Sequence, residues 1–204
     1  MAPLAYTLAL LAMTVATMAI KVVPLDMALD SFDDQYWGCS HAMNVALPAL
    51  HNSEYQLNPH FAWSWFHADA QWHKRGSPVS SLVSPWQAVA VMAYTMMYLY
   101  KEFNVAVSVA GRSHQEYQNK FQFKMLHFLL TEDLVMLRHA QNGQCHHVFL
   151  GVRDVQFQAW RGQRVRFGQF TSASLSKETT QKYGTDTIIE VHMCHSMDIQ
   201  AFSF

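Results

Sequence analysis

The sequence predicts an α+β fold in which a helical N-terminal half is followed by a strand-rich remainder. Two observations predict it. Between residues 84 and 138 apolar residues recur at helical spacing behind capping signals, whereas after Gly143 they alternate with polar residues in short runs rich in Val, Phe, Ile and Thr. Helices that precede strands, rather than alternating with them, are typical of α+β domains.

Length and composition fit one domain. The 204 residues are 50% hydrophobic and 14% charged, which is enough apolar material to bury a core, and no repeat or linker interrupts them. The formal net charge of -1 offers no broad attraction for nucleic-acid phosphates. We therefore expect a single domain over residues 20–204 and no nucleic-acid partner.

The first residues are typical of a signal peptide. Residues 4–20 are apolar or small and uncharged, Lys21 follows, and Thr17 and Ala19 are the small residues that a signal peptidase requires. A membrane-spanning helix is the alternative, but it needs about 20 apolar residues, slightly more than this run has. We expect residues 1–19 to be removed, leaving a secreted or extracellular mature chain without a transmembrane segment.

Export affects how the cysteines are interpreted. The chain has three of them, Cys39, Cys145 and Cys194. In an oxidising compartment two can pair and one is left over, and the residues alone permit three choices of pair. A zinc site is the alternative, since histidines flank two cysteines at positions His146, His147, His192 and His195. Zinc ligands usually recur at regular spacing, which neither cluster has, so we expect a disulfide and no metal.

The first expected helix begins near residue 31. Ser31, followed three residues later by Asp34, resembles a capping box, and the apolar residues that follow support a helix to about Leu47. Pro48 is then expected to end it, because proline lacks the N–H that a helix interior needs.

The middle of the chain predicts irregular structure followed by a buried helix. Residues 52–84 are rich in Trp, His, Ser and Pro without clear periodicity, so we expect irregular structure with room for one helix. Ser84 as N-cap and Pro85 in the first turn then introduce a helix over residues 86–103. Its apolar positions are too dense for a surface helix, which indicates that it is largely buried.

A second capping signal introduces the last long helix. Ser113 with Glu116 repeats the capping-box pattern and begins a helical stretch that reaches about Arg138. The pattern is interrupted near Phe123 and Lys124, where we expect a bend or a break.

The later runs are expected to be strands separated by turn residues. They are residues 148–151, 155–160, 164–170 and 185–193. In the third run Arg164 and Arg166 alternate with Val165 and Phe167, so one face could meet a phosphate-bearing ligand, although solvated arginines on an outer face are the commoner arrangement.

Several stretches carry a more specific signal than any generic catalytic motif. They are residues 31–39 (SFDDQYWGC), 93–95 (AYT), 99–104 (LYKEFN), 123–131 (FKMLHFLLT), 148–152 (VFLGV), 165–175 (VRFGQFTSASL) and 199–204 (IQAFSF). In this order, from about residue 26 to the last residue, they resemble the vertebrate ecto-mono-ADP-ribosyltransferases.

The resemblance implies an ADP-ribosyltransferase core and its reaction. The ADP-ribose of NAD is transferred to the guanidinium of a protein arginine acceptor, and nicotinamide is released, so NAD is a substrate; NADP as the preferred donor stays open. Because the glycosidic carbon passes through an oxocarbenium-like state, such a site grips the phosphates, holds the ribose and places a carboxylate near the developing charge. The family uses an Arg, a Ser-x-Ser strand and a Glu-x-Glu loop.

The resemblance also nominates residues. Ser172 matches the first serine of Ser-x-Ser, with an implied catalytic role of positioning the nicotinamide ribose and the glutamate. Gly151 matches a glycine whose backbone meets the nicotinamide amide, where the lack of a side chain allows close approach. Tyr183 resembles the aromatic that stacks on nicotinamide. Weaker candidates for lining the nucleotide pocket are Tyr94, Asn104 and Gln169.

Two departures from the family pattern qualify the implied activity. Leu150 stands where the family has its phosphate-gripping Arg, and the family continues beyond Phe204 into the Glu-x-Glu loop, so we expect the domain to lack its C-terminal end. The alternative function is therefore a noncatalytic secreted relative that binds NAD or a protein partner. A lipid anchor at the cell surface would apply only to a longer chain. The resemblance implies a Cys39–Cys194 disulfide, leaving Cys145 free.

Overall fold

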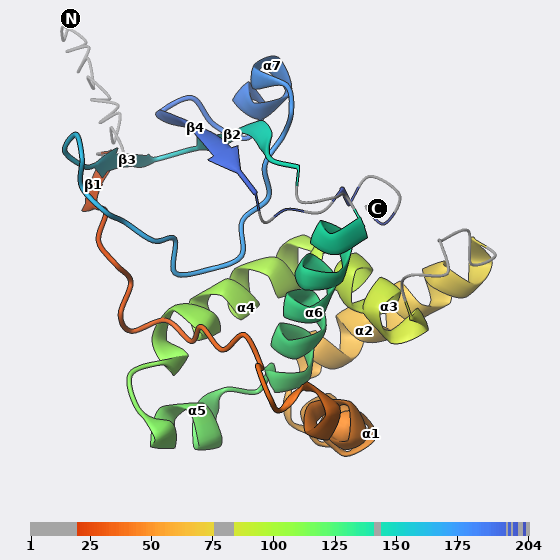
Figure 1. Ribbon diagram of the computed structural model, residues 1–204. Helices are drawn as coiled ribbons and strands as arrows, with labels where there is room; N and C mark the ends of the chain where they lie inside the picture. The colour runs from red at the N-terminus through yellow and green to blue at the C-terminus, as the bar shows by residue number, and fades with distance from the viewer. Residues whose placement is uncertain are drawn as a thin grey trace, which may run out of the picture.

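The computed structural model describes residues 20–75, 84–140, 144–194, 196, 198, 199 and 202, so the expected signal peptide lies outside the described residues. Within this part of the chain, long helices form one layer and short strands form a smaller layer beside it (Figure 1). The predicted α+β class is confirmed.

The helices are α1 Ser40–Leu57, α2 Pro59–Lys74, α3 Pro85–Tyr94, α4 Met97–Ala110, α5 His114–Lys120, α6 Lys124–Ala140 and α7 Lys177–Gln181. The strands are β1 Lys21–Pro24, β2 His146–Val152, β3 Val155–Gln158 and β4 Thr187–Met193. β1 pairs with β3 in parallel, and β2 pairs with β4 antiparallel. Among the described residues, no helix combines the length and hydropathy needed to cross a membrane.

The first helix differs from the prediction at both ends. It begins at Ser40 and continues nine residues past Pro48. Ser31 does not cap a helix, because its hydroxyl donates to the carbonyl of Gly168. Proline inside a helix costs about 3 kcal/mol, and here that cost is offset by the packing of α1 against α2 and α6. Residues 25–39, which we call the N-terminal strap, run instead as turns and extended chain along the helices (Figure 1).

The segment expected to be irregular contains a full helix, α2. Asn58 caps it, accepting hydrogen bonds from the N–H groups of His60 and Phe61, and Pro59 occupies the first helical position, where its missing N–H costs nothing. The buried face is Phe61, Ser64, Trp65, Ala68 and Trp72, a spacing of three and four residues. The helical period was therefore present but was obscured by Trp and His on both faces.

The later helices largely follow their capping signals. The capping box of Ser84 with Gln87 is formed, and α3 is buried as predicted, but the single expected helix is divided at Thr95–Met96 into α3 and α4. Ser113 caps α5, and the expected break before Lys124 is confirmed because α6 begins there.

Three of the four expected strands are confirmed, and the run at residues 164–170 is not a strand. The guanidinium of Arg166 donates to the carbonyls of Met27 and Ala28 and pairs with Asp33. The run is therefore held by the strap rather than by a sheet, and Arg166 is not available for a phosphate. β1 was not predicted, because β3, its strand partner within the described part of the chain, follows about 130 residues later.

An aromatic cluster around His127 joins the strap to the helices. The ring of this buried residue lies 4.8 Å from that of Phe32 and 5.4 Å from that of Phe170. Its Nδ1 is 2.8 Å from the hydroxyl of Tyr36. Burial lowers the pKa of His127 to about 4, so the ring is neutral and serves as a packed, hydrogen-bonded core residue.

The disulfide joins Cys145 to Cys194, so the Cys39–Cys194 pairing implied by the resemblance is wrong for this structure. The register of β2 and β4 explains the pairing: His146 lies opposite Met193, which places the next residue outward on each strand side by side. Cys39 is free and half-buried at the start of α1. The zinc interpretation of Cys145 and Cys194 fails as well, because their sulfurs are bonded to each other.

We expect non-reducing peptide mapping to recover one linked peptide pair containing Cys145 and Cys194 and to find Cys39 alkylated. Removing the bridge in a Cys145→Ser/Cys194→Ser variant should lower the free energy of unfolding by about 4 kcal/mol, because the closed loop spans 49 residues. Cys39→Ser is the matched control and should leave the linked peptides unchanged. A recovered Cys39–Cys194 peptide would contradict the assignment.

Glu54 of α1 holds the first turn of α6. Its carboxylate accepts from the N–H of Lys124 at 2.5 Å and from the N–H of Met125 at 3.3 Å. The side chain is only 2% exposed. Burial raises the pKa of Glu54 from 4.5 to about 7, and the two backbone hydrogen bonds offset only part of that rise.

Glu54 should therefore make stability fall as pH rises from 4.5 to 7, because the unfolded chain releases this proton while the folded protein retains it. Glu54→Gln cannot ionise, so its unfolding free energy relative to wild type should increase by up to about 3 kcal/mol between pH 4.5 and pH 7.5. Urea titrations at several pH values measure the difference. Ser53→Ala, at an exposed and uncharged position of the same helix, should show no such trend, and a flat difference for Glu54→Gln would refute the assignment.

Candidate functional site

The Ser-x-Ser segment lies alongside β2. The N–H of Phe149 donates to the carbonyl of Ser174 at 2.8 Å, and the N–H of Ser174 donates back at 2.9 Å. The bridge is isolated, because no backbone hydrogen bond joins Ser172 to Gly151. Ser172 and Gly151, 21 positions apart in the chain, thus each lie two residues along the chain from the same Phe149–Ser174 contact.

Gly151 is required by the packing of the chain itself. A Cβ at this position would lie 2.4 Å from the carbonyl oxygen of Thr180 and 2.7 Å from that of Gly184. The turn that follows α7 therefore packs directly on the backbone of β2, and the hydroxyl of Thr180 reinforces the contact by donating to the carbonyl of Phe149. A contact between Gly151 and nicotinamide stays a prediction.

Tyr183 projects from this same turn. Its N–H donates to the carbonyl of Thr180 at 3.0 Å, and the residue after it, Gly184, packs against the end of β2. The Tyr183 side chain is 71% exposed. An aromatic ring is thereby presented to solvent beside the strand end that carries Gly151, which is the arrangement that stacking on a planar ligand needs.

The helical layer contributes Tyr94 and Asn104. The amide of Asn104 donates to the carbonyl of Phe170 at 3.0 Å, and the Tyr94 ring lies 6.2 Å from the Phe170 ring. Burial raises the pKa of Tyr94, while the nearby side chains of Asn104 and Ser172 oppose the rise in part. Tyr94, Asn104 and Ser172 are therefore neighbours, although they belong to different layers of the fold.

Two polar atoms in this neighbourhood keep unused hydrogen-bonding capacity. The Tyr94 hydroxyl and the Oδ1 atom of Asn104 are buried, and neither has a partner that meets hydrogen-bond geometry. The influence of Asn104 and Ser172 on the Tyr94 pKa shows proximity rather than a formed hydrogen bond. Because a hydrogen bond weakens steeply with angle and distance, both atoms remain able to bind a further partner.

Gln169 and Leu150 lie outside the group formed by Tyr94, Asn104 and Ser172. Gln169 is exposed, and no described contact joins its side chain to the other nominated residues. Leu150 is 4% exposed and shares the buried face of β2 with Val148. The position where the family carries its arginine is thus filled by an inward-facing apolar side chain.

Sequence reasoning missed residues that hold the site together. Phe170 supplies both the carbonyl that Asn104 binds and a ring that packs in the core, and Tyr100 lies 5.4 Å from Tyr94, ring to ring. Phe170 was inside the stretch that carries the family resemblance, so an aromatic two residues before Ser172 was the available signal. Nothing in the local pattern distinguished Tyr100 from other core aromatics.

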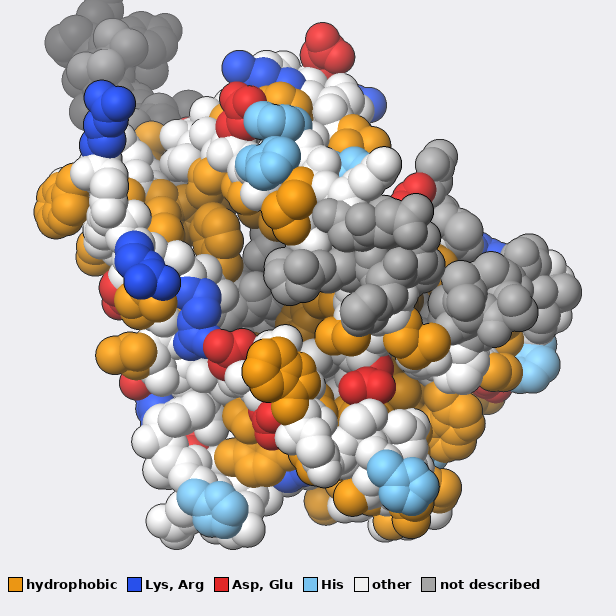
Figure 2. Space-filling model, viewed as in Figure 1, with side chains coloured by type: hydrophobic (Ala, Val, Ile, Leu, Met, Phe, Trp, Pro, Cys, Tyr) orange, Lys and Arg blue, Asp and Glu red, His pale blue; other side chains and the backbone are white. Residues whose placement is uncertain are grey.

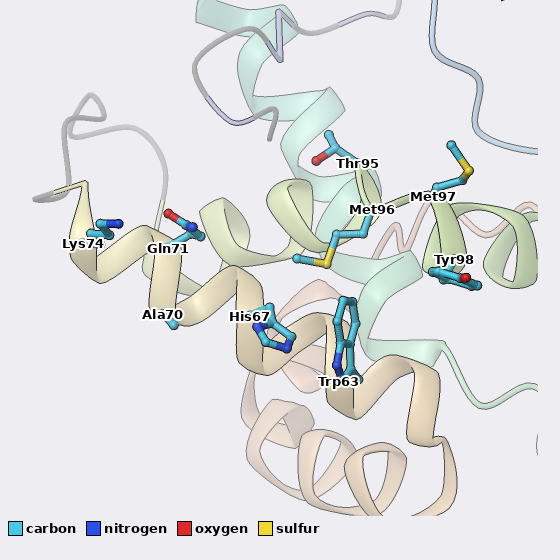
Figure 3. Close-up of a pocket in the computed structure, with 9 residues that line it drawn as sticks. All are labelled: Trp63, His67, Ala70, Gln71, Lys74, Thr95, Met96, Met97 and Tyr98. Carbon is cyan, nitrogen blue, oxygen red and sulfur yellow. The ribbon is translucent and has the colours of Figure 1, made fainter.

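A separate hollow of ≈ 470 Å³ lies on the helical layer, between α2 and the corner that joins α3 to α4 (Figure 3). Its lining includes Trp63, His67, Gln71, Met96 and Tyr98. None of the nominated cofactor-binding residues lines it. We therefore place the candidate site at the junction of β2, the Ser172 segment and the turn after α7, where the nominated residues gather.

Comparison with known proteins identifies the family. The model of a family described as ART, NAD:arginine ADP-ribosyltransferase, matches residues 25–204. The erythroblast NAD(P)(+)–arginine ADP-ribosyltransferase of Gallus gallus is 46% identical over 187 residues, covering 90% of this chain and 62% of the relative. The GPI-linked NAD(P)(+)–arginine ADP-ribosyltransferase 1 of Homo sapiens is 43% identical, covering 89% of this chain and 61% of the relative. The chain thus spans about three fifths of the length of these relatives.

Solved structures of mono-ADP-ribosyltransferases have a similar fold. The crystal structure of the eucaryotic mono-ADP-ribosyltransferase ART2.2 superposes with a TM-score of 0.76 at 32% identity, covering 89% of this chain and 80% of that chain. A mutant of ART2.2 in complex with NAD gives a TM-score of 0.77 with the same identity and coverage.

Asn104→Ala tests whether the helical layer positions the Ser172 segment. The change leaves the Phe170 carbonyl without its donor, which should cost about 1–3 kcal/mol in unfolding free energy. Hydrogen–deuterium exchange should also rise selectively in residues 168–176. Val105→Ala, on the exposed side of the same helix, is the control and should alter neither measurement. Unchanged exchange in Asn104→Ala would show that this hydrogen bond does not hold the segment.

Proposed function

Because this chain belongs to the NAD:arginine ADP-ribosyltransferase family, we propose that it binds NAD at the β2–Ser172 junction and serves the transfer of ADP-ribose to a protein arginine. In that reaction the bond between nicotinamide and the ribose breaks, nicotinamide leaves, and a guanidinium nitrogen bonds to the ribose carbon. The observation that carries the proposal is the antiparallel bridge between Phe149 and Ser174. It brings the segment that bears Ser172 alongside β2, the strand that carries Gly151 and packs against the turn bearing Tyr183.

Each nominated residue has a role that its position suits. The Ser172 hydroxyl, exposed beside β2, would hydrogen-bond the nicotinamide ribose. The exposed Tyr183 ring would stack on nicotinamide, and the backbone of Gly151 would meet its amide. The buried Tyr94 hydroxyl and Asn104 amide support the Ser172 segment from the side of the helical layer and offer it polar partners.

Leu150 favours a second candidate function, that of a relative that binds NAD or a protein partner without turnover. A buried leucine donates no hydrogen bond to a pyrophosphate. A charge-assisted hydrogen bond contributes about 1.5–3 kcal/mol, so NAD should bind less tightly here than in a relative with Arg at this position. A transferase and a relative that binds NAD without turnover would use the same nucleotide surface and differ in whether nicotinamide is released, whereas a relative that binds only a protein partner would not bind NAD.

We also propose an extracellular location with cleavage near Ala19. The support is the apolar leader and the presence of GPI-linked proteins among the relatives. The Cys145–Cys194 disulfide fits the same location, because disulfides persist in oxidising compartments. Sequencing the N-terminus of the secreted product tests the cleavage site.

Calorimetric titration with NAD tests the nucleotide site. We expect saturable binding to wild type, and roughly fivefold to tenfold weaker binding to Ser172→Ala, which loses one hydrogen bond. Ser53→Ala, at an exposed serine of α1, should bind as wild type does. Equal affinity of Ser172→Ala and wild type would remove Ser172 from the site.

The same titration also tests how Leu150 affects NAD affinity. Because Leu150 is buried, Leu150→Arg must first be shown by circular dichroism to fold with the added charge. The folded variant should bind NAD roughly 10- to 100-fold more tightly through a charge-assisted contact, while Leu150→Met, which keeps the volume and adds no charge, should not. A nicotinamide-release assay with a guanidino acceptor then separates the two functions. Release above background supports the transferase, and NAD binding with no release supports the noncatalytic relative.

A further inference from the structure

One face of the β2–β4 pair carries a row of potential metal ligands. His147 lies directly opposite His192 in the antiparallel register, and Glu190 follows two residues away on β4. Alternate residues of a strand share a face, so His147, Glu190 and His192 project from the same side. Figure 2 shows adjoining His side chains with an acidic side chain beside them over the part of the molecule that β2 and β4 occupy in Figure 1.

Two distances within this row suit a shared metal ion, one between the two imidazole rings and one between His147 and Glu190. The rings of His147 and His192 have centroids 4.8 Å apart. Two imidazoles bound to one tetrahedral zinc ion, with bonds of about 2.0–2.1 Å, have centroids roughly 5 Å apart. His147 Nδ1 lies 3.6 Å from Glu190 Oε1. That is too long for a hydrogen bond and close to the roughly 3.3 Å between two ligand atoms on such an ion.

We propose that His147, Glu190 and His192 form a binding site for a divalent transition-metal ion, with zinc as the fitting metal. Imidazole and carboxylate are ligands that Zn²⁺ accepts. Three protein ligands with a water in the fourth position is a common zinc arrangement. The exposed side chains of His147 and Glu190, at 66% and 64%, leave that water position open to solvent. The site is distinct from the Ser172 segment, which lies on the other edge of β2.

The disulfide prepares the site without joining it. Cys145 and Cys194 tie the two strands together one cross-strand pair beyond His147 and His192 on the same face. The spacing of the two strands at His147 and His192 is therefore fixed before a metal binds, which lowers the entropic cost of binding. The sulfurs lie near His192, within 4.8 Å between ligand atoms, but as a disulfide they carry no thiolate for a metal.

The test is calorimetric titration of the oxidised full chain, free of any affinity tag and stripped with EDTA, with ZnCl₂ at pH 7.4. We expect one equivalent to bind. His147→Ala and His192→Ala should each weaken binding at least tenfold, and Glu190→Gln should weaken it as well. His146→Ala is the matched control, because this neighbouring histidine points to the opposite face and should leave affinity unchanged. Circular dichroism of each variant confirms that it is folded.

Titration with Co²⁺ identifies the ligand atoms. The site predicts a tetrahedral cobalt spectrum without a thiolate charge-transfer band, retained in a Cys145→Ala/Cys194→Ala variant that keeps the histidines. Three results would overturn the proposal: no saturable binding by wild type, wild-type affinity in His147→Ala, or a thiolate band that disappears with the cysteines. The last would assign the metal to a reduced Cys145, His192 and Cys194 site instead.

Discussion

The attachment of Phe170 is the constraint on which the geometry of the site depends. Its ring is packed among His127, Phe103 and Tyr94, and its carbonyl is bound by Asn104. A backbone group and a side chain of one residue are thereby fixed to α3, α4 and α6 together. Because Ser172 follows two residues later and Ser174 is bonded to β2, the short segment between the layers has little freedom. The helical core therefore sets the position of a serine in the strand layer.

Local signals predicted those parts of the fold that local interactions determine. Ser84 and Ser113 cap helices as expected, and the break before Lys124 is where the periodicity failed. The predictions were wrong where contacts with residues distant in the sequence outweigh the local signals. Pro48 is accommodated within α1 by packing against other helices, and Ser31 is drawn away from helix capping by the carbonyl of Gly168, 137 residues further along the chain. Neither partner can be recognised from neighbouring residues.

The candidate site was predictable only through family resemblance, because its residues come from segments that no spacing rule connects. The roles of Ser172 and Gly151 stay predictions, and the residue that holds the segment, Phe170, was overlooked because it resembles any other core aromatic. The predicted disulfide pairing was wrong for a related reason. Which two of three cysteines pair depends on the register of β2 and β4, and the choice between Cys39 and Cys145 is made there.

The N-terminal strap has a consequence for the order in which the chain can fold during synthesis. β1 pairs with β3, and the strap is held by Arg166 and Gly168. These three partners, β3, Arg166 and Gly168, all lie in the last third of the chain. Contacts at such separation cannot form until most of the protein has left the ribosome, whereas the helices need partners closer in sequence. β1 and the start of the strap are thus among the last parts to be secured, whereas Phe32 and Tyr36 can pack on the helices as soon as α6 has been made.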